Sequence, residues 1–264
     1  MSEEVLTNHY THTTFNDSNA SAAKTFRQSA ASTAGDPMAP IIQVQLQDTL
    51  VPDNFEGSGV ANVLTLQPVI PILPGKIISY PQITRLTLNI LATTPNPQRT
   101  TGIGDLTAFD QLVVKRSKSL SLGVGAVVVL PTASNDDLGQ GKYQIGPSFS
   151  LLSNTDDWQL GFILQDQFSV AGDSDREAVH EMTWQPILNY VTGKWYMGVG
   201  DFTWLLDWEN NNHLSIPFAL QVGYVTRLGQ YNYNFSIEPY KWITHSGPSD
   251  NWGIRFGVVL MLPE

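Results

Sequence analysis

The sequence predicts an all-β fold, a transmembrane up-and-down antiparallel β-barrel of about 12 strands. Three patterns indicate this fold. Apolar and polar side chains alternate with period two along most of the chain beyond residue 40. The polar positions carry amides, hydroxyls and glycine rather than charges. The segments between the alternating stretches are short and long in turn.

The alternation is simplest in the stretch 42–47, where isoleucine, valine and leucine alternate with three glutamines. One face of such a strand is apolar and the other can hydrogen-bond to water. Each stretch has about 10 residues, the length that a tilted strand needs to cross a bilayer. In chain order, the predicted strands are 42–47, 59–72, 77–92, 104–114, 120–130, 144–151, 159–167, 182–191, 196–208, 214–224, 231–238 and 252–262.

Composition excludes several classes of function. Of the 264 residues, 42% are hydrophobic, so full-length disorder is not expected. Charged residues make up 14%, against roughly 25% in an ordinary soluble domain. The net charge of −10 lacks the basic surface that nucleic acids require, and we expect no nucleic-acid partner. Without cysteine, the chain has no disulfides, Cys-ligated zinc or thiol nucleophile.

The longest weakly polar run, 119–130, is too short for a membrane-spanning helix, which needs about 20 residues. The N-terminus has no basic region followed by an apolar stretch, so an exported form would have lost its signal peptide. Residues 1–39 are rich in Asn, Thr, Ser and Ala, and we interpret them as a polar tail or lumen plug that precedes a barrel at 40–264. An even number of strands would place both termini on the periplasmic side.

The connections and their flanking residues support a membrane barrel. Short turns are predicted near 74–76, 115–119, 154–157, 192–194 and 227–230. All but the turn at 154–157 carry lysine or arginine, whereas the longer loops carry aspartate and glutamate. Tryptophan and tyrosine gather at both ends of the strands, as in the aromatic girdles of outer-membrane barrels. A soluble β-sandwich binding module also alternates and remains the alternative fold, although its polar face would carry more charge.

Several segments resemble, in their order and spacing, the bacterial outer-membrane channel family of the meta-pathway of phenol degradation. They begin at Asp36-Pro-Met-Ala-Pro and continue through Leu64-Thr-Leu-Gln-Pro, Gly102-Ile-Gly-Asp and Leu130-Pro-Thr-Ala to Leu138-Gly-Gln-Gly-Lys. The resemblance implies a channel in the outer membrane of a Gram-negative bacterium, surrounded by outer-membrane lipid. It implies passive uptake of small molecules, including hydrophobic or aromatic compounds.

The polar face of the strands predicts the lining of a narrow lumen. Arg85 and Arg255 are the candidate charge-selective groups, with a structural ion pair to Glu238 or Asp105 as the alternative role. The other predicted lining residues share amide side chains: Gln45, Asn89, Gln165 and Asn234.

Prolines inside the strands predict bends in the wall, because each one removes a donor from the hydrogen-bond ladder. They lie at Pro68, Pro147, Pro186, Pro217 and Pro239. Two interpretations stand side by side: bulges at the barrel rims, or a kinked wall with a lateral exit for hydrophobic solutes.

No catalytic, cofactor or metal site is expected, and we predict that the chain is not an enzyme. The five histidines are scattered between the N-terminal tail and the loop ends, which is typical of solvated residues. No Gly-x-Ser-x-Gly motif is present. The remaining alternative is an outer-membrane lipid-modifying enzyme, which would need a serine, a histidine and an orienting polar group together on the outer surface.

Overall fold

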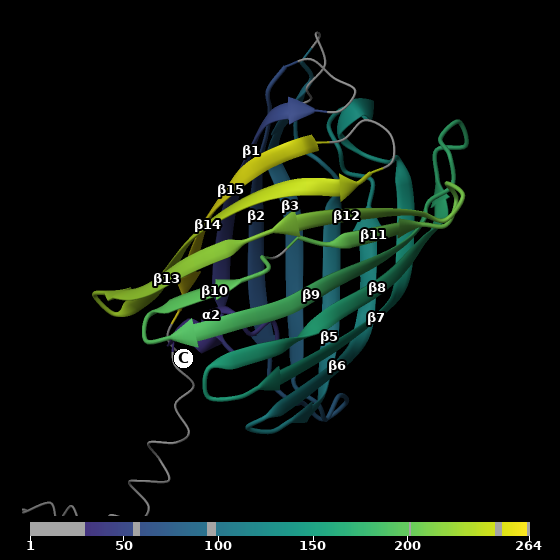
Figure 1. Ribbon diagram of the computed structural model, residues 1–264. Coiled ribbons are helices and arrows are strands. Elements are labelled where there is room, and N and C mark those ends of the chain that lie inside the picture. The colour runs from purple at the N-terminus through teal and green to yellow at the C-terminus, as the bar shows by residue number, and fades with distance from the viewer. Residues whose placement is uncertain (1–29, 55–58, 94–98, 201, 246–249, 263–264) are drawn as a thin grey trace, which may run out of the picture.

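The computed structural model describes residues 30–54, 59–93, 99–200, 202–245 and 250–262. Its strands form a closed antiparallel barrel of 12 wall strands, each paired with its neighbours in sequence (Figure 1). Closure comes from β1 (Gln43–Asn54) and β15 (Asp250–Met261), which pair from Gln43 opposite Met261 onward. The predicted fold class is confirmed, and the β-sandwich alternative is wrong.

The wall continues from β1 through eight further strands that are uninterrupted along the barrel. They are β2 (Ala61–Ile72), β3 (Gln82–Thr93), β5 (Leu106–Arg116), β6 (Leu120–Leu130), β7 (Lys142–Asn154), β8 (Trp158–Gly172), β9 (His180–Thr192) and β14 (Tyr231–Thr244). Helix α2 (Ala30–Ala34) and the 3-10 helix η1 (Asp136–Leu138) lie outside the wall, and the short strand β4 (Thr101–Gly102) pairs with the end of β3.

Two wall strands are each divided into two pieces. The first consists of β10 (Trp195–Gly198) and β11 (Trp204–Asp207), and the second of β12 (His213–Ala219) and β13 (Gln221–Leu228). The sequence predicted both as continuous strands, at 196–208 and 214–224. Tight turns follow β5, β7, β9 and β13, as predicted, and the connections at the opposite end of the barrel are longer than these. The short turn predicted at 74–76 is wrong, because β2 and β3 are joined by the longer segment 73–81.

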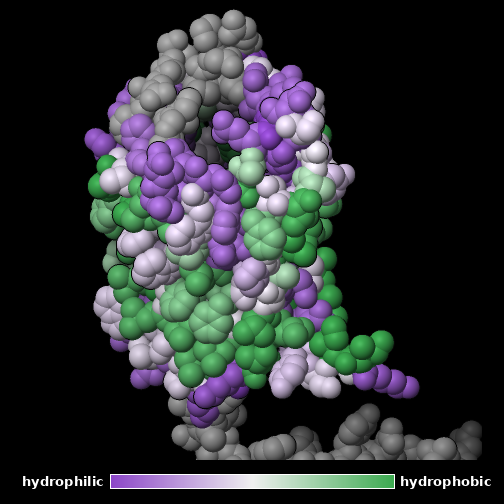
Figure 2. Space-filling view, turned by 90° about the vertical axis from the view of Figure 1, so that its right-hand side faces the viewer, coloured by the Kyte–Doolittle hydropathy of each residue, from purple (hydrophilic) through white to green (hydrophobic). Residues whose placement is uncertain are grey.

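The side chains sort by face as the alternation predicted. Large apolar residues at outward positions are exposed, for example Leu46, Leu160, Phe235 and Val258. Figure 2 shows apolar side chains gathered in the lower half of one face, with hydrophilic ones near the upper rim. Among the described residues, no helix is long and apolar enough to cross a membrane.

Residues 30–41 lie within the short-turn end of the barrel. Helix α2 contacts β9, β10, β13 and β14, and Figure 1 places it at the end where the C-terminus lies. Ala31, Asp36, Met38 and Ala39 are all buried. The first 29 residues of the predicted segment 1–39 lie outside the described residues.

Candidate functional site

The lumen contains a chamber of about 410 Å³. Residues 34–37 and the apolar side chains of the lower wall form part of its lining. Amide side chains dominate the rest, and they can both donate and accept hydrogen bonds. These amides are Gln43, Gln45, Gln47, Gln67, Asn89, Gln165, Gln167, Gln185, Asn189, Gln221 and Asn234.

Six of the eight predicted lumen residues line this chamber: Arg85, Arg255, Gln45, Asn89, Gln165 and Asn234. Some amides are held by neighbours on adjacent strands. Thr65 Oγ1 donates to Asn89 Oδ1 at 2.8 Å, and Asn234 Nδ2 donates to the Tyr196 hydroxyl at 2.9 Å. The lining is therefore a partly fixed array of donors and acceptors.

Glu238 lies in the wall beneath Arg255, with 1% of its surface exposed. Arg255 Nη1 lies 3.6 Å from Glu238 Oε2. This is the structural ion pair with Glu238 that the sequence offers as an alternative to charge selection. The guanidinium also lies over the Phe202 ring, 3.9 Å from its centroid. Arg85, on β3 three strands away around the barrel, lies over the ring of Phe109 at 4.7 Å. Both arginines are thus held against aromatic rings.

Asp105 lies outside the chamber, at the long-loop end just before β5. Its carboxylate accepts hydrogen bonds from the backbone N–H groups of Ala133 and Gln140, at 3.0 and 2.8 Å. It thereby fastens the loop that follows β6. A lone aspartate beside a strand gives no sign in the sequence of whether it faces the lumen or holds a loop.

Apolar side chains replace amides on the inward face near the short-turn end. We call this ring the collar. It comprises Val69, Ile83, Phe109, Val113, Leu152, Ile163, Ile187, Val191, Tyr196, Val225, Val259 and Met261, from two buried clusters on β2, β3, β5, β7, β8, β9, β10, β13 and β15.

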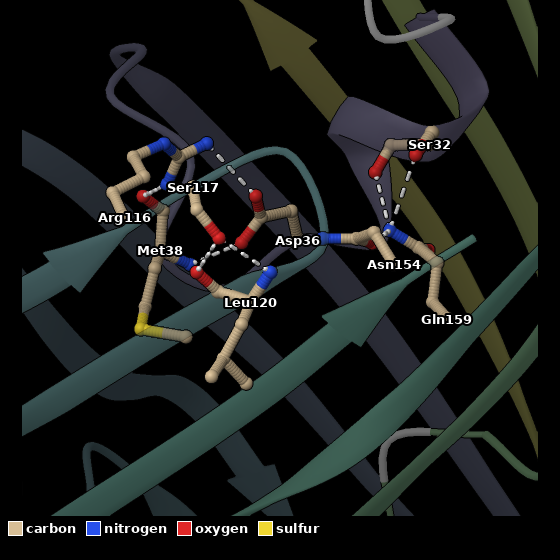
Figure 3. A network of polar contacts seen from close by, with 8 residues as sticks. All are labelled: Ser32, Asp36, Met38, Arg116, Ser117, Leu120, Asn154 and Gln159. Atoms are coloured by element: carbon tan, nitrogen blue, oxygen red, sulfur yellow. Dashed lines mark hydrogen bonds and ion pairs between the residues drawn. The ribbon is translucent and has the colours of Figure 1, made fainter. Parts of the chain in front are cut away.

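Residues 30–41 fill the collar. Met38 packs into one of its two clusters, and Ala31 into the other with Ala34 and Ile41 against it. Polar groups hold the same segment (Figure 3). Arg116 Nη2 donates to Asp36 Oδ2 at 3.0 Å. Gln159 Nε2 donates to the Ser32 carbonyl at 2.8 Å. This short-turn end of the lumen is therefore closed by apolar packing and by two polar tethers.

The divided strands leave a break in the hydrogen-bonded wall, which we call the wall break. On one side, β9 pairs with β11 from Glu181 to Trp184 and with β10 from Asn189 to Thr192. Residues 185–187 of β9 therefore have no ladder partner on that side. On the other side, β12 pairs with β11 at 213–215, while 216–219 pair only with β14.

Two of the five predicted kink prolines border the wall break, Pro186 on β9 and Pro217 on β12. Pro239 lies beside it, where its carbonyl accepts from Leu220 N between β12 and β13. Pro68 and Pro147 are paired on one side, opposite Val44 and Ala126 respectively, and on the other side the ladder skips two residues and then resumes. Proline alone therefore does not open the wall.

Between β10 and β11, the described residues lie inside the lumen instead of continuing the wall. Gly200 and Thr203 line the chamber, and Phe202 stacks on Tyr240 with ring centroids 4.1 Å apart. Gly200 has a φ of 77°, and a Cβ there would overlap the Glu238 carboxylate. The sequence reasoning missed this segment, although Gly198 and Gly200 interrupt the alternation there.

The outer edge of the wall break carries aromatic side chains. Trp184 and Trp204 meet edge to face with ring centroids 5.1 Å apart, and Phe162 lies 6.2 Å from Trp184. Trp184 is exposed, so this row faces outward. An apolar or aromatic solute would find stacking partners at this edge.

One outward histidine bears on the enzyme alternative. His180 Nε2 lies 3.3 Å from Asp166 Oδ1, and Trp208 Nε1 also donates to Asp166. None of the hydrogen bonds found among the described residues joins His180 to a serine hydroxyl. The same part of the chain has no cluster of three or more His, Asp or Glu residues placed to hold a metal ion.

The collar and the Asp36–Arg116 contact were also missed by the sequence reasoning. A signal for the collar exists, since Leu152, Ile163 and Val191 stand at lumen positions where the alternation calls for polar residues. No comparable signal marks the ion pair, because its partners lie 80 residues apart in the chain.

Comparison with solved structures places this fold beside outer-membrane proteins. The COG4313 outer membrane channel from Pseudomonas putida F1 matches with a TM-score of 0.59 and 12% identity, over 84% of this chain and 94% of that one. The KdgM porin matches with a TM-score of 0.48 and 9% identity, over 84% and 99%. Outer membrane phospholipase A from Escherichia coli matches with 0.42 and 10%, over 85% and 93%. Neither a protein-family model nor a curated protein matches the sequence.

Proposed function

We propose that this chain is an outer-membrane channel of a Gram-negative bacterium that lets small molecules enter by diffusion. One observation carries the proposal: a closed barrel with an apolar outer surface encloses an amide-lined chamber of about 410 Å³. Amide groups can replace the water that a polar solute loses as it enters. The channel fold is shared with the Pseudomonas putida structure.

The solutes in this proposal are hydrophobic or aromatic compounds that leave sideways. Residues 30–41 obstruct the short-turn end of the lumen, whereas the wall break opens the hydrogen-bonded wall beside the chamber. Pro186 lines the chamber and also borders the break. Trp184 and Trp204 offer an aromatic surface at its outer edge. The break is thus a candidate lateral exit into the bilayer.

The periplasmic position of both termini and the relation to the phenol meta-pathway channels belong to the same proposal. The turns after β5, β7, β9 and β13 are tight, as is usual on the periplasmic side of outer-membrane barrels. Residues 30–41 would then plug the periplasmic end. Cell-surface labelling tests this orientation: a tag inserted at 208–212 should be labelled in intact cells, and one at 229–230 should not.

The experiment that tests the function measures entry of an apolar dye into cells. N-phenyl-1-naphthylamine is uncharged, aromatic and largely excluded by an intact outer membrane. A porin-poor Gram-negative host that expresses the chain should take up the dye several-fold faster than one that expresses an unrelated barrel of similar size. Equal rates, with the folded barrel verified in the outer membrane, would contradict the proposal. Lipid analysis of the same cells tests the enzyme alternative, which predicts newly released fatty acids.

A further inference from the structure

The collar is an apolar ring that belongs to the wall and not to the N-terminal segment. Its members come from nearly every part of the barrel, from Val69 on β2 to Val259 on β15. The chamber above it is lined mainly by amides and threonines. A solute that travels along the barrel axis therefore meets a polar compartment first and an apolar constriction second.

Polar side chains at the level of the collar bond to one another or to residues 30–41. Gln111 Nε2 donates to Ser148 Oγ at 3.3 Å, and Ser150 Oγ donates to Gln111 Oε1 at 2.6 Å. All three are buried. Gln159 is bonded to Ser32 and Asn154. Apolar collar side chains supply most of the surface that remains toward the axis, although the buried Gln43 and Asn234 stand in register with Met261 and Val259.

We propose that the collar is itself a filter, which excludes ions and strongly hydrated solutes even after residues 30–41 are released, and which then admits only weakly polar, uncharged molecules. The inference rests on the proposed function. An ion that enters an apolar ring loses hydration that nothing there replaces, and such constrictions close pores by expelling water. Release of the N-terminal segment would therefore not make a general porin.

The first test compares conductance in planar bilayers after deletion of residues 1–41. The deletion variant should show a small KCl current, because the collar remains apolar. Adding Val113→Thr, Val191→Thr and Val225→Thr keeps the side-chain shapes and supplies hydroxyls from both clusters, so the current should rise about tenfold. The matched control makes the opposite change in the chamber, with Thr87→Val, Thr107→Val and Thr183→Val, and should leave the current low.

A large current from the deletion variant alone, equal to that of the threonine variant, would overturn the proposal. Heat-modifiable migration on gels checks that each variant is a folded barrel. Failure of the proposed function looks different: cells would take up no dye, whatever the conductance of these variants.

The second test keeps the full chain and so does not depend on folding of the deletion variant. Because the chain has no cysteine, Ile163→Cys places the sole thiol in the collar and Thr87→Cys places it in the chamber. Propyl methanethiosulfonate and its anionic sulfonatoethyl analogue are similar in size. Both should label the chamber thiol, but the anionic reagent should label the collar thiol about tenfold more slowly than the propyl reagent. Because residues 30–41 occupy the collar, labelling of the collar thiol reports their transient release, and equal rates with the two reagents would contradict the filter.

Discussion

Arg116 and Asp36 lie 80 residues apart in the chain and form an ion pair at the short-turn end of the lumen, with Arg116 Nη2 3.0 Å from Asp36 Oδ2. Arg116 Nη1 also donates to the Met38 carbonyl at 2.5 Å, and the Met38 N–H donates to Asp36 Oδ1 at 2.9 Å. The end of β5 thus holds the segment that places Met38 in the collar (Figure 3).

The first prediction concerns this ion pair. Arg116→Ala leaves the Asp36 carboxylate buried without its cation. Because the arginine side chain is itself 33% exposed, we expect a loss of about 1–3 kcal/mol in the stability of the docked segment. Limited proteolysis should cut residues 30–41 faster, and a thiol at Ile163→Cys should react faster with the propyl reagent. Lys115→Ala, on the same strand, is the control. Unchanged proteolysis in Arg116→Ala would show that apolar packing alone holds the segment.

The second prediction concerns the backbone at Gly200. A methyl group there must adopt the left-handed backbone conformation and also displace the Glu238 carboxylate, so Gly200→Ala should lower the free energy of unfolding by about 2–3 kcal/mol. Gly229→Ala is matched, because its φ is 63° and a Cβ there meets no atom within 4 Å. Gly229→Ala should lower the free energy of unfolding by only about 1 kcal/mol. Urea titration of the purified barrels measures both, and equal losses would refute the contact with Glu238.

The third prediction concerns the wall break. Pro186→Val and Pro217→Val together restore two backbone donors at its borders, which favours pairing of the wall across it. If solutes leave there, dye entry into cells should fall several-fold. Pro68→Val adds a donor where β2 is paired with β1 and its ladder with β3 resumes at Val69, away from the wall break, and should leave dye entry unchanged. Undiminished entry in the double variant would exclude this route.

The fourth prediction concerns the chamber arginines. Arg255→Gln leaves the Glu238 carboxylate without its cation, and Arg85→Gln removes a positive charge from β3, three strands away in the chamber wall. Each variant is combined with Thr87→Cys, and the thiol is labelled with the anionic reagent and with its cationic trimethylammonium analogue. The ratio of the cationic to the anionic labelling rate should rise about three- to tenfold. Arg227→Gln, at the exposed end of β13, should leave the ratio of rates unchanged. A ratio that stays constant in both chamber variants would remove these arginines from any role in charge selection.

The sequence by itself determined which residues face the bilayer and which face the lumen. Period-two alternation is a local property, since consecutive side chains of a strand point to opposite faces. The glutamines that alternate from Gln43 to Gln47 could therefore be assigned to the lumen before any contact was known, and the chamber contains them. The alternation of tight turns and longer connections is equally local, because hairpin pairing fixes it.

Only the tertiary structure decided where the alternation gives way. Residues 199–203 read as part of a strand, but Phe202 gains stacking on Tyr240 and Arg255 only after β14 and β15 have closed the barrel. Asp36 meets Arg116, and Gln159 meets Ser32, across 80 and 127 residues. Contacts of this kind depend on closure of the barrel around one axis, which no local pattern records. For the same reason, the collar became a ring only when strands from β2 to β15 enclosed Met38.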